Sequence, residues 1–157
     1  MNEQTTKNST SNAGMTATSR AQASWEGDLA SGKGRVRSGS GAFPELPVSW
    51  ATRTVRSDGA TSPEELLAAA HASCFSMALS NVLSKASHRP DRLSTSAEFD
   101  FVPGTGITEV RLSVRGKVAG IANDEFLRLA NDAKENCPVS KALAASVRIS
   151  LEAALEG

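Results

Sequence analysis

The feature that most constrains the fold is one long uninterrupted helical segment in the middle of the chain, residues 62–85. Ser62 is a good N-cap, Pro63 suits the first helical position, and Glu65 completes a capping-box pattern. The run 66–85 contains neither glycine nor proline, and alanine and serine lie on several of its faces. Helices that are apolar or small nearly all round are usually buried. The segment therefore predicts a central buried helix.

Strand patterns precede this helix. Residues 21–25 and 34–41 predict two strands joined by a glycine-containing turn at 31–34. Two prolines then break regular structure, and residues 48–53 predict a third strand. The first half of the chain is therefore expected to be rich in strands up to the start of the helix.

The segments after the helix predict a hairpin, two further helices and a closing strand. Alternating apolar residues at 97–101 and 110–114 lie on either side of a Pro-Gly turn, which predicts an antiparallel hairpin. Helices are expected over 123–136 and again from Pro138, and alternation at 147–151 predicts the last strand. Strands on both sides of a central helix indicate an α+β domain.

Length and composition narrow the class of protein. The 157 residues fit one domain, placed at 20–157 behind a polar tail, residues 1–19, that is expected to be disordered or loosely ordered. The 17 basic and 17 acidic side chains balance, whereas a nucleic-acid binder normally has a basic surplus. No stretch is expected to approach the length of apolar sequence that a membrane span needs, and the N-terminus lacks the pattern of a secretory signal. These features predict a cytoplasmic protein that binds neither nucleic acid nor membrane.

The two cysteines are the candidate reactive groups. In a reducing compartment such a pair is more often catalytic or redox-active than structural. Cys74 lies in the middle of the long helix, where a free cysteine usually packs as a small hydrophobe. Cys137 directly precedes Pro138 at the expected cap of a new helix, where a thiol pKa is lowered, although packing in a pocket is an equal alternative. With only two cysteines and two histidines, no metal or bound cofactor is expected.

A nucleophilic Cys74 must be a thiolate, which requires a nearby cation. Arginine suits this role because its charge survives burial, and the candidates are Arg35, Arg37, Arg53 and Arg56. A buried arginine needs a carboxylate, which points to Glu64, although acids are common in a first helical turn. Glu64 and Cys74 are ten residues apart on one helix, a rise of about 15 Å. If both serve one site, Glu64 must come from a second subunit of an intertwined two-fold dimer.

Other residues near Cys74 have simpler interpretations. His71 lies one turn before Cys74 and allows a Cys–His nucleophile. A core or interface histidine is nevertheless the commoner case, by roughly three to one. Phe75 and Met77 are interpreted as packing residues in a position to line an apolar pocket.

The strings TSPEELLAAAHASCFSMALS and NCPVSKAL resemble the OsmC/Ohr family of thiol-dependent peroxidases. The upstream segments WEGDLASGKGRV and WATR fit the OsmC (osmotically inducible protein C) branch, and the Gly-Arg-Asp-Gly turn typical of the Ohr branch is missing. The resemblance runs from about Arg20 to the C-terminus. It implies an OsmC-like α+β fold, in which antiparallel sheets wrap around two long central helices of an intertwined homodimer with its sites at the subunit interface.

The resemblance also implies a role for each site residue. Cys74 matches the peroxidatic cysteine, Cys137 the resolving cysteine and Glu64 the motif's carboxylate. Arg53 matches the arginine that stabilises the thiolate, with Arg35 or Arg37 as alternatives. The implied substrates are organic hydroperoxides and hydrogen peroxide, and an external dithiol, often a lipoyl group on a carrier protein, restores the thiols.

Two other functions stay open from the sequence. One is a Cys–His hydrolase built on Cys74 and His71. The other is a non-enzymatic redox-sensing or binding module, in which the disulfide only changes the shape of the protein.

Overall fold

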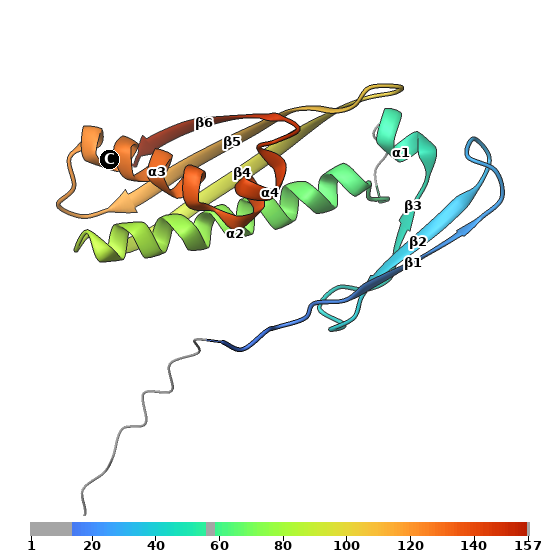
Figure 1. Ribbon diagram of the computed structural model, residues 1–157, viewed down its shortest axis with the longest axis horizontal. Helices are drawn as coiled ribbons and strands as arrows, with labels where there is room; N and C mark the ends of the chain where they lie inside the picture. Colours follow the sequence, from blue (N-terminus) through green and yellow to red (C-terminus); the bar gives the residue numbers. More distant parts are fainter. Residues whose placement is uncertain (1–13, 56–58, 157) are drawn as a thin grey trace, which may run out of the picture.

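The computed structural model describes residues 14–55 and 59–156 (Figure 1). The strands are β1 (Ala21–Glu26), β2 (Lys33–Ser38), β3 (Leu46–Val48), β4 (Pro90–Val102), β5 (Gly106–Val118) and β6 (Arg148–Leu155). The helices are α1 (Trp50–Thr54), α2 (Pro63–Lys85), α3 (Asn123–Asn136) and α4 (Pro138–Leu143). The strands form two three-stranded sheets, ordered β1-β2-β3 and β4-β5-β6. The α+β class expected from the sequence is confirmed.

The hydrophobic core lies between the sheet β4-β5-β6 and the helices α2 and α3 (Figure 1). We call this sheet and the helices α2, α3 and α4 the body. The buried side chains of this core come from α2, β5 and α3, and include Phe75, Leu79, Leu112, Val114 and Phe126. Gly116 of β5 allows the Phe126 ring of α3 to pack directly against the strand, because a Cβ at this position would lie only 2.6 Å from that ring. Period-four burial on α2 and alternation on β5 therefore meet in one core.

The sheet β1-β2-β3, which we call the arm, lies apart from the body (Figure 1). Every residue of β1 is exposed, and Trp25 keeps 43% of its surface accessible. The arm joins the body where β3 meets the start of α2, through a hydrogen bond from Thr61 N to Pro47 O of 3.0 Å. A three-stranded sheet with so little buried surface has almost no core of its own.

The predicted order of elements from the long helix onward is confirmed. The β4–β5 hairpin is antiparallel and pairs Ala97 with Leu112 and Phe99 with Val110, as the alternation required. The strands β1 and β2 likewise form an antiparallel pair. One feature differs, because β6 joins β5 in parallel and makes that sheet mixed rather than wholly antiparallel.

The third strand predicted at 48–53 is wrong. The strand β3 ends at Val48, and Ser49 caps the short helix α1. Ser49 Oγ accepts from Thr52 N at 3.3 Å, and Thr52 Oγ1 accepts from Ser49 N at 3.2 Å. This reciprocal cap uses threonine in the third position and satisfies two free donors, so it outweighs the strand preference of the segment.

The capping box predicted at the start of α2 is half present. Ser62 Oγ accepts from Glu65 N at 3.1 Å, as expected. The Glu65 carboxylate instead accepts from the Thr61 hydroxyl at 2.8 Å. The helix still begins at Pro63, because the cap and the proline suffice to define its start.

Burial of α2 on all sides, as predicted, is wrong for a single chain. One face is buried, and the opposite face is open, with Met77 67% exposed. The packing role expected of Met77 is therefore absent within one chain, whereas Phe75 is fully buried. By length and composition α2 is also apolar enough to cross a membrane, with a mean hydropathy of 1.5 over an 18-residue window. This corrects the expectation that no stretch approaches such a length.

The tail predicted at 1–19 is described only from residue 14, and residues 14–19 are exposed without a helix or strand. The remaining tail residues, 1–13, lie outside the described residues, as does the candidate Arg56. The division into tail and domain stays a prediction.

Candidate active site

The structure brings the two cysteines together. Cys74 is partly buried on α2, and Cys137 is fully buried at the junction of α3 and α4. Cys74 packs against the core cluster that contains Cys137, and the two thiols are close enough for Cys137 to raise the pKa of Cys74. Both are free thiols. This arrangement can form a disulfide between α2 and the start of α4 once one sulfur is oxidised.

The backbone of Cys137 joins two helices. Its N–H donates to Ala133 O at 2.8 Å, which ends α3, and its carbonyl accepts from Lys141 N at 2.9 Å, which begins α4. Pro138 has no N–H to offer. The next donor is the N–H of Val139, which acts to lower the pKa of the Cys74 thiol.

The pKa of the Cys74 thiol is raised above its ordinary value. Burial is the largest cause, because it disfavours the charged thiolate. The hydrogen bond from the Val139 N–H acts in the opposite direction, and the neighbouring Cys137 thiol adds to the increase. None of these three influences is a positive charge. The cation expected beside Cys74 therefore does not come from the described part of its own chain.

Arg53 and Glu64 form the best-buried ion pair of the described residues. Arg53 Nη2 lies 2.7 Å and Nε 3.1 Å from Glu64 Oε1, and Glu64 is only 3% exposed. The guanidinium also stacks on Phe101, 4.1 Å from the ring centroid, and lies 5.8 Å from that of Trp50. Three neighbours thus hold the guanidinium in one orientation. A pocket of about 360 Å³ opens beside the pair.

The four predicted site residues therefore form two separate pairs within one chain. Cys74 meets Cys137, and Arg53 meets Glu64. Glu64 begins the helix that carries Cys74 ten residues later, so the two pairs are about 15 Å apart along the axis.

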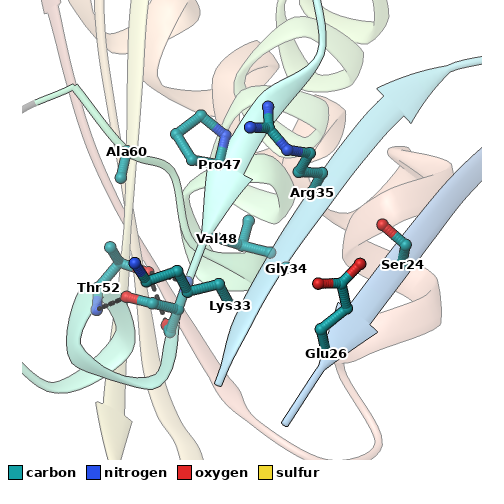
Figure 2. A pocket seen from close by; sticks show the side chains of 10 residues that line it. Ser24, Glu26, Lys33, Gly34, Arg35, Pro47, Val48, Thr52 and Ala60 are labelled. Atoms are coloured by element: carbon teal, nitrogen blue, oxygen red, sulfur yellow. Dashed lines mark hydrogen bonds between the residues drawn. The ribbon is translucent and has the colours of Figure 1, made fainter. Parts of the chain in front are cut away.

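The alternative arginines of β2 have partners in the arm. Arg35 pairs with Glu45 at 3.2 Å, and Arg37 binds the side chain of Gln22. Arg35 also lines a pocket of about 380 Å³ between β1, β2, β3 and α1 (Figure 2). Neither arginine has a described contact with Glu64.

His71 is fully buried and does not make the contact that a Cys–His nucleophile requires. Its Nε2 lies 2.8 Å from Ser140 Oγ of α4, and its ring packs edge-on against Phe99. Burial lowers the pKa of His71, which keeps the ring neutral. No hydrogen bond to Cys74 is found in residues 14–55 and 59–156.

Sequence reasoning missed four residues around these pairs: Trp50, Phe101, Val139 and Ser140. Val139 and Ser140 carried a weak signal, because they follow Cys137-Pro138 in the first turn of a helix. Trp50 and Phe101 carried none, because stacking on Arg53 depends on how α1 meets β4. Among the described residues no group of three or more His, Cys, Asp or Glu side chains is arranged to hold a metal ion.

Comparisons with known proteins identify the family. The family model for OsmC-like proteins matches residues 56–152. Peroxiredoxin OsmC of Escherichia coli is 41% identical over 138 residues, covering 86% of this chain and 96% of that protein.

Solved structures agree with this match. An organic hydroperoxide resistance protein OsmC of Legionella pneumophila superposes with a TM-score of 0.66 at 25% identity, covering 88% of this chain and 99% of that one. The organic hydroperoxide resistance protein OhrB of Bacillus subtilis gives 0.64 at 26% identity, covering 86% and 98%. With this fold, this paired-cysteine geometry and these relatives, the chain belongs to the OsmC family.

Proposed function

We propose that this chain reduces organic hydroperoxides and hydrogen peroxide with Cys74 as peroxidatic and Cys137 as resolving cysteine. Membership of the OsmC family makes it a cysteine-based, thiol-dependent peroxidase. The single observation that carries the residue assignment is the proximity of the two free thiols, one on α2 and the other at the start of α4. The names of the relatives from Legionella pneumophila and Bacillus subtilis, both organic hydroperoxide resistance proteins, support the choice of substrate.

The reaction follows from this proximity. The Cys74 thiolate attacks the peroxide oxygen that carries the hydrogen, the O–O bond breaks, and the leaving alkoxide, or hydroxide from hydrogen peroxide, takes a proton to become an alcohol or water. The Cys74 sulfenic acid then reacts with Cys137 to give a disulfide and water. An external dithiol restores both thiols by exchange. A dihydrolipoyl group on a carrier protein is the proposed reductant, and the reducing cytoplasm is the proposed location.

The thiolate needs a cation, because burial raises the pKa of Cys74. Arg53 suits this role: it is held by Glu64 and Phe101, and its Nη1 takes no part in the ion pair. The helical rise separates it from Cys74 of the same chain. We therefore assign the cation beside each Cys74 to Arg53 of the partner subunit in a homodimer.

Two exposed surfaces support a homodimer. One is the open face of α2 around Met77, and the other is the arm, which has little core within one chain. A second copy that covers both would bury the apolar side of α2, which also accounts for the high hydropathy of this helix. Two-fold symmetry then brings the start of one α2 toward the middle of the other.

A coupled peroxide-consumption assay with dihydrolipoamide tests the function, using tert-butyl hydroperoxide and hydrogen peroxide. Cys74→Ser is expected to abolish consumption while the protein stays folded, and Cys137→Ser to allow one turnover and then stall or overoxidise. Steady-state activity that survives Cys74→Ser contradicts the proposal.

The two alternative functions predict different results. A Cys–His hydrolase would turn over an ester without Cys137, and the bond from His71 to Ser140 gives it no structural support. A redox sensor would form one disulfide per chain and show no turnover with dithiol.

A further inference from the structure

A buried hydrogen bond fastens α4 to α2 beside the cysteine pair. His71 Nε2 and Ser140 Oγ are 2.8 Å apart, and the two residues are 0% and 4% exposed. His71 lies three residues before Cys74 on α2, and Ser140 three residues after Cys137 at the start of α4. The two helices therefore touch at two levels one turn apart, at the thiols and at this hydrogen bond.

The direction of the hydrogen bond follows from what surrounds the ring. His71 is neutral because burial lowers its pKa, so only one of its nitrogens carries a proton. Its Nδ1 is buried with no hydrogen-bond partner in the described part of the chain. A buried N–H without a partner is rarer than a buried acceptor without one. The proton therefore lies on Nε2, which donates to Ser140 Oγ.

We propose that His71 and Ser140 are positioning residues that keep the first turn of α4 in register with α2, so that Cys137 resolves oxidised Cys74. This inference rests on the proposed function. The hydrogen bond adds a directional contact between α2 and α4 to the packing around the thiols, and so restricts the rotation of α4. It also keeps Val139, whose N–H acts to lower the pKa of Cys74, in place beside that thiol.

The step that depends on this register is the formation of the disulfide. The Cys137 sulfur attacks Sγ of the Cys74 sulfenic acid, the S–S bond forms and the S–O bond breaks. The departing hydroxide takes the proton released by Cys137 and leaves as water. If α4 turns away, the sulfenic acid survives long enough to meet a second peroxide and becomes a sulfinic acid. The hydrogen bond thus decides between resolution and overoxidation.

The test measures this partition in the full chain. Reduced protein is mixed with tert-butyl hydroperoxide, quenched at set times with a thiol-blocking reagent and analysed by intact mass. Ser140→Ala is expected to slow disulfide formation about tenfold, because it leaves the His71 donor buried and unpaired. Overoxidation to the sulfinic acid should begin at a correspondingly lower peroxide concentration. His71→Leu is expected to behave in the same way.

Two further variants separate positioning from general packing. His71→Gln keeps an amide donor and is expected to stay within about threefold of the wild-type rate of disulfide formation. Thr95→Val is the control: it also removes a 2.8 Å hydrogen bond to α2, the one that Thr95 accepts from Ser76. Thr95 lies on β4, so this bond does not involve α4. Thr95→Val is expected to leave the rate and the partition unchanged.

Wild-type rates in both Ser140→Ala and His71→Leu would overturn the positioning role. So would equal slowing by Ser140→Ala and Thr95→Val. If His71→Leu does not fold, Ser140→Ala and its control still decide the question. Cys74→Ser in the coupled assay tests the proposed function separately, so a failed positioning role and a failed peroxidase function give different results.

Discussion

The body and the arm of this chain differ in how much apolar surface they bury within one chain. The body buries Phe75, Leu79 and Phe126 between a sheet and two helices, and it holds the cysteine pair inside that core. The arm has a fully exposed strand, β1, and it leads along the chain to α1, which carries Arg53. The body has a core within one chain, although one face of α2 is open, whereas the arm has almost none. The proposed catalytic thiols lie in the body, and the proposed activating cation, Arg53, lies on α1, which connects the arm to the body, where Glu64 of α2 and Phe101 of β4 hold it.

This difference links assembly to chemistry. In a single chain the pKa of Cys74 is raised by burial, and no positive charge of the described residues opposes the increase. If the arm and the open face of α2 meet a second copy, the same contact that covers apolar surface also delivers Arg53. Dimer formation would then switch on the nucleophile, and a dissociated chain would be folded in its body but inactive.

The largest expected effect contrasts the two regions in stability. Phe75→Ala should lower the free energy of unfolding by about 3–5 kcal/mol, because it opens a cavity in the body. Trp25→Ala in the arm should cost less than about 1 kcal/mol at concentrations where the chain is monomeric, since Trp25 is 43% exposed there. Urea unfolding at low protein concentration measures both. Equal losses would mean that the arm has a core within one chain.

The second prediction concerns the open face of α2. Met77→Asp should cost a single chain little, because Met77 is 67% exposed, but it should dissociate the dimer. We expect kcat/KM for tert-butyl hydroperoxide to fall about a hundredfold, as the thiolate loses its cation. Sedimentation velocity and the coupled assay give the two readouts. Ser96→Asp adds the same charge to an exposed position of β4 and should change neither. An active, dimeric Met77→Asp variant would contradict this role of the face.

The third prediction compares two adjacent acids at the start of α2. Glu64→Gln should lower kcat/KM about thirtyfold, because Arg53 loses the carboxylate that orients it. Glu65→Gln changes a neighbouring carboxylate that binds only the Thr61 hydroxyl among its described contacts, and should stay within about twofold. The coupled assay at several peroxide concentrations separates kcat from KM. Equal losses in the two variants would indicate a general effect on the helix end.

The smallest expected effect is a dependence of stability on pH within the body. Burial lowers the pKa of His71 in the folded state, so the unfolded chain binds a proton that the folded chain does not. The free energy of unfolding should therefore fall as the pH drops below about 6.5, by at most about 1.4 kcal/mol per pH unit. His71→Gln should flatten this part of the profile in urea unfolding between pH 5 and pH 8. An unchanged slope would assign the dependence to other groups.

The sequence predicted the body better than the arm for a physical reason. The cap at Ser62, the run without glycine or proline, and the alternation at Phe99 and Val110 are local patterns that act together in one core. At 48–53 the alternating pattern misled, because the reciprocal cap between Ser49 and Thr52 starts a short helix there. Burial of α2 on all sides was inferred from composition, which does not distinguish a core from an interface.

The candidate site likewise contains residues that the sequence indicates and residues that only the fold reveals. Cys74 and Cys137 carried their own signals, a reactive residue type and a helix cap, and the structure brings them into contact. Arg53 could be chosen from four arginines only through the family resemblance, because its partner Glu64 and its ring contacts depend on tertiary packing. Ser140 is an ordinary residue in the sequence, and only the fold gives it His71 as a partner.

The most direct test of the central claim mixes two inactive chains. Cys74→Ser and Arg53→Ala are unfolded together, refolded as a mixture, and assayed for peroxide consumption with dihydrolipoamide. If each site takes its sulfur from one subunit and its guanidinium from the other, mixed dimers contain one complete site. Activity should then return to about a quarter of the wild-type value. A mixture as inactive as its two components would contradict the shared site and place the required arginine in the same chain as its cysteine.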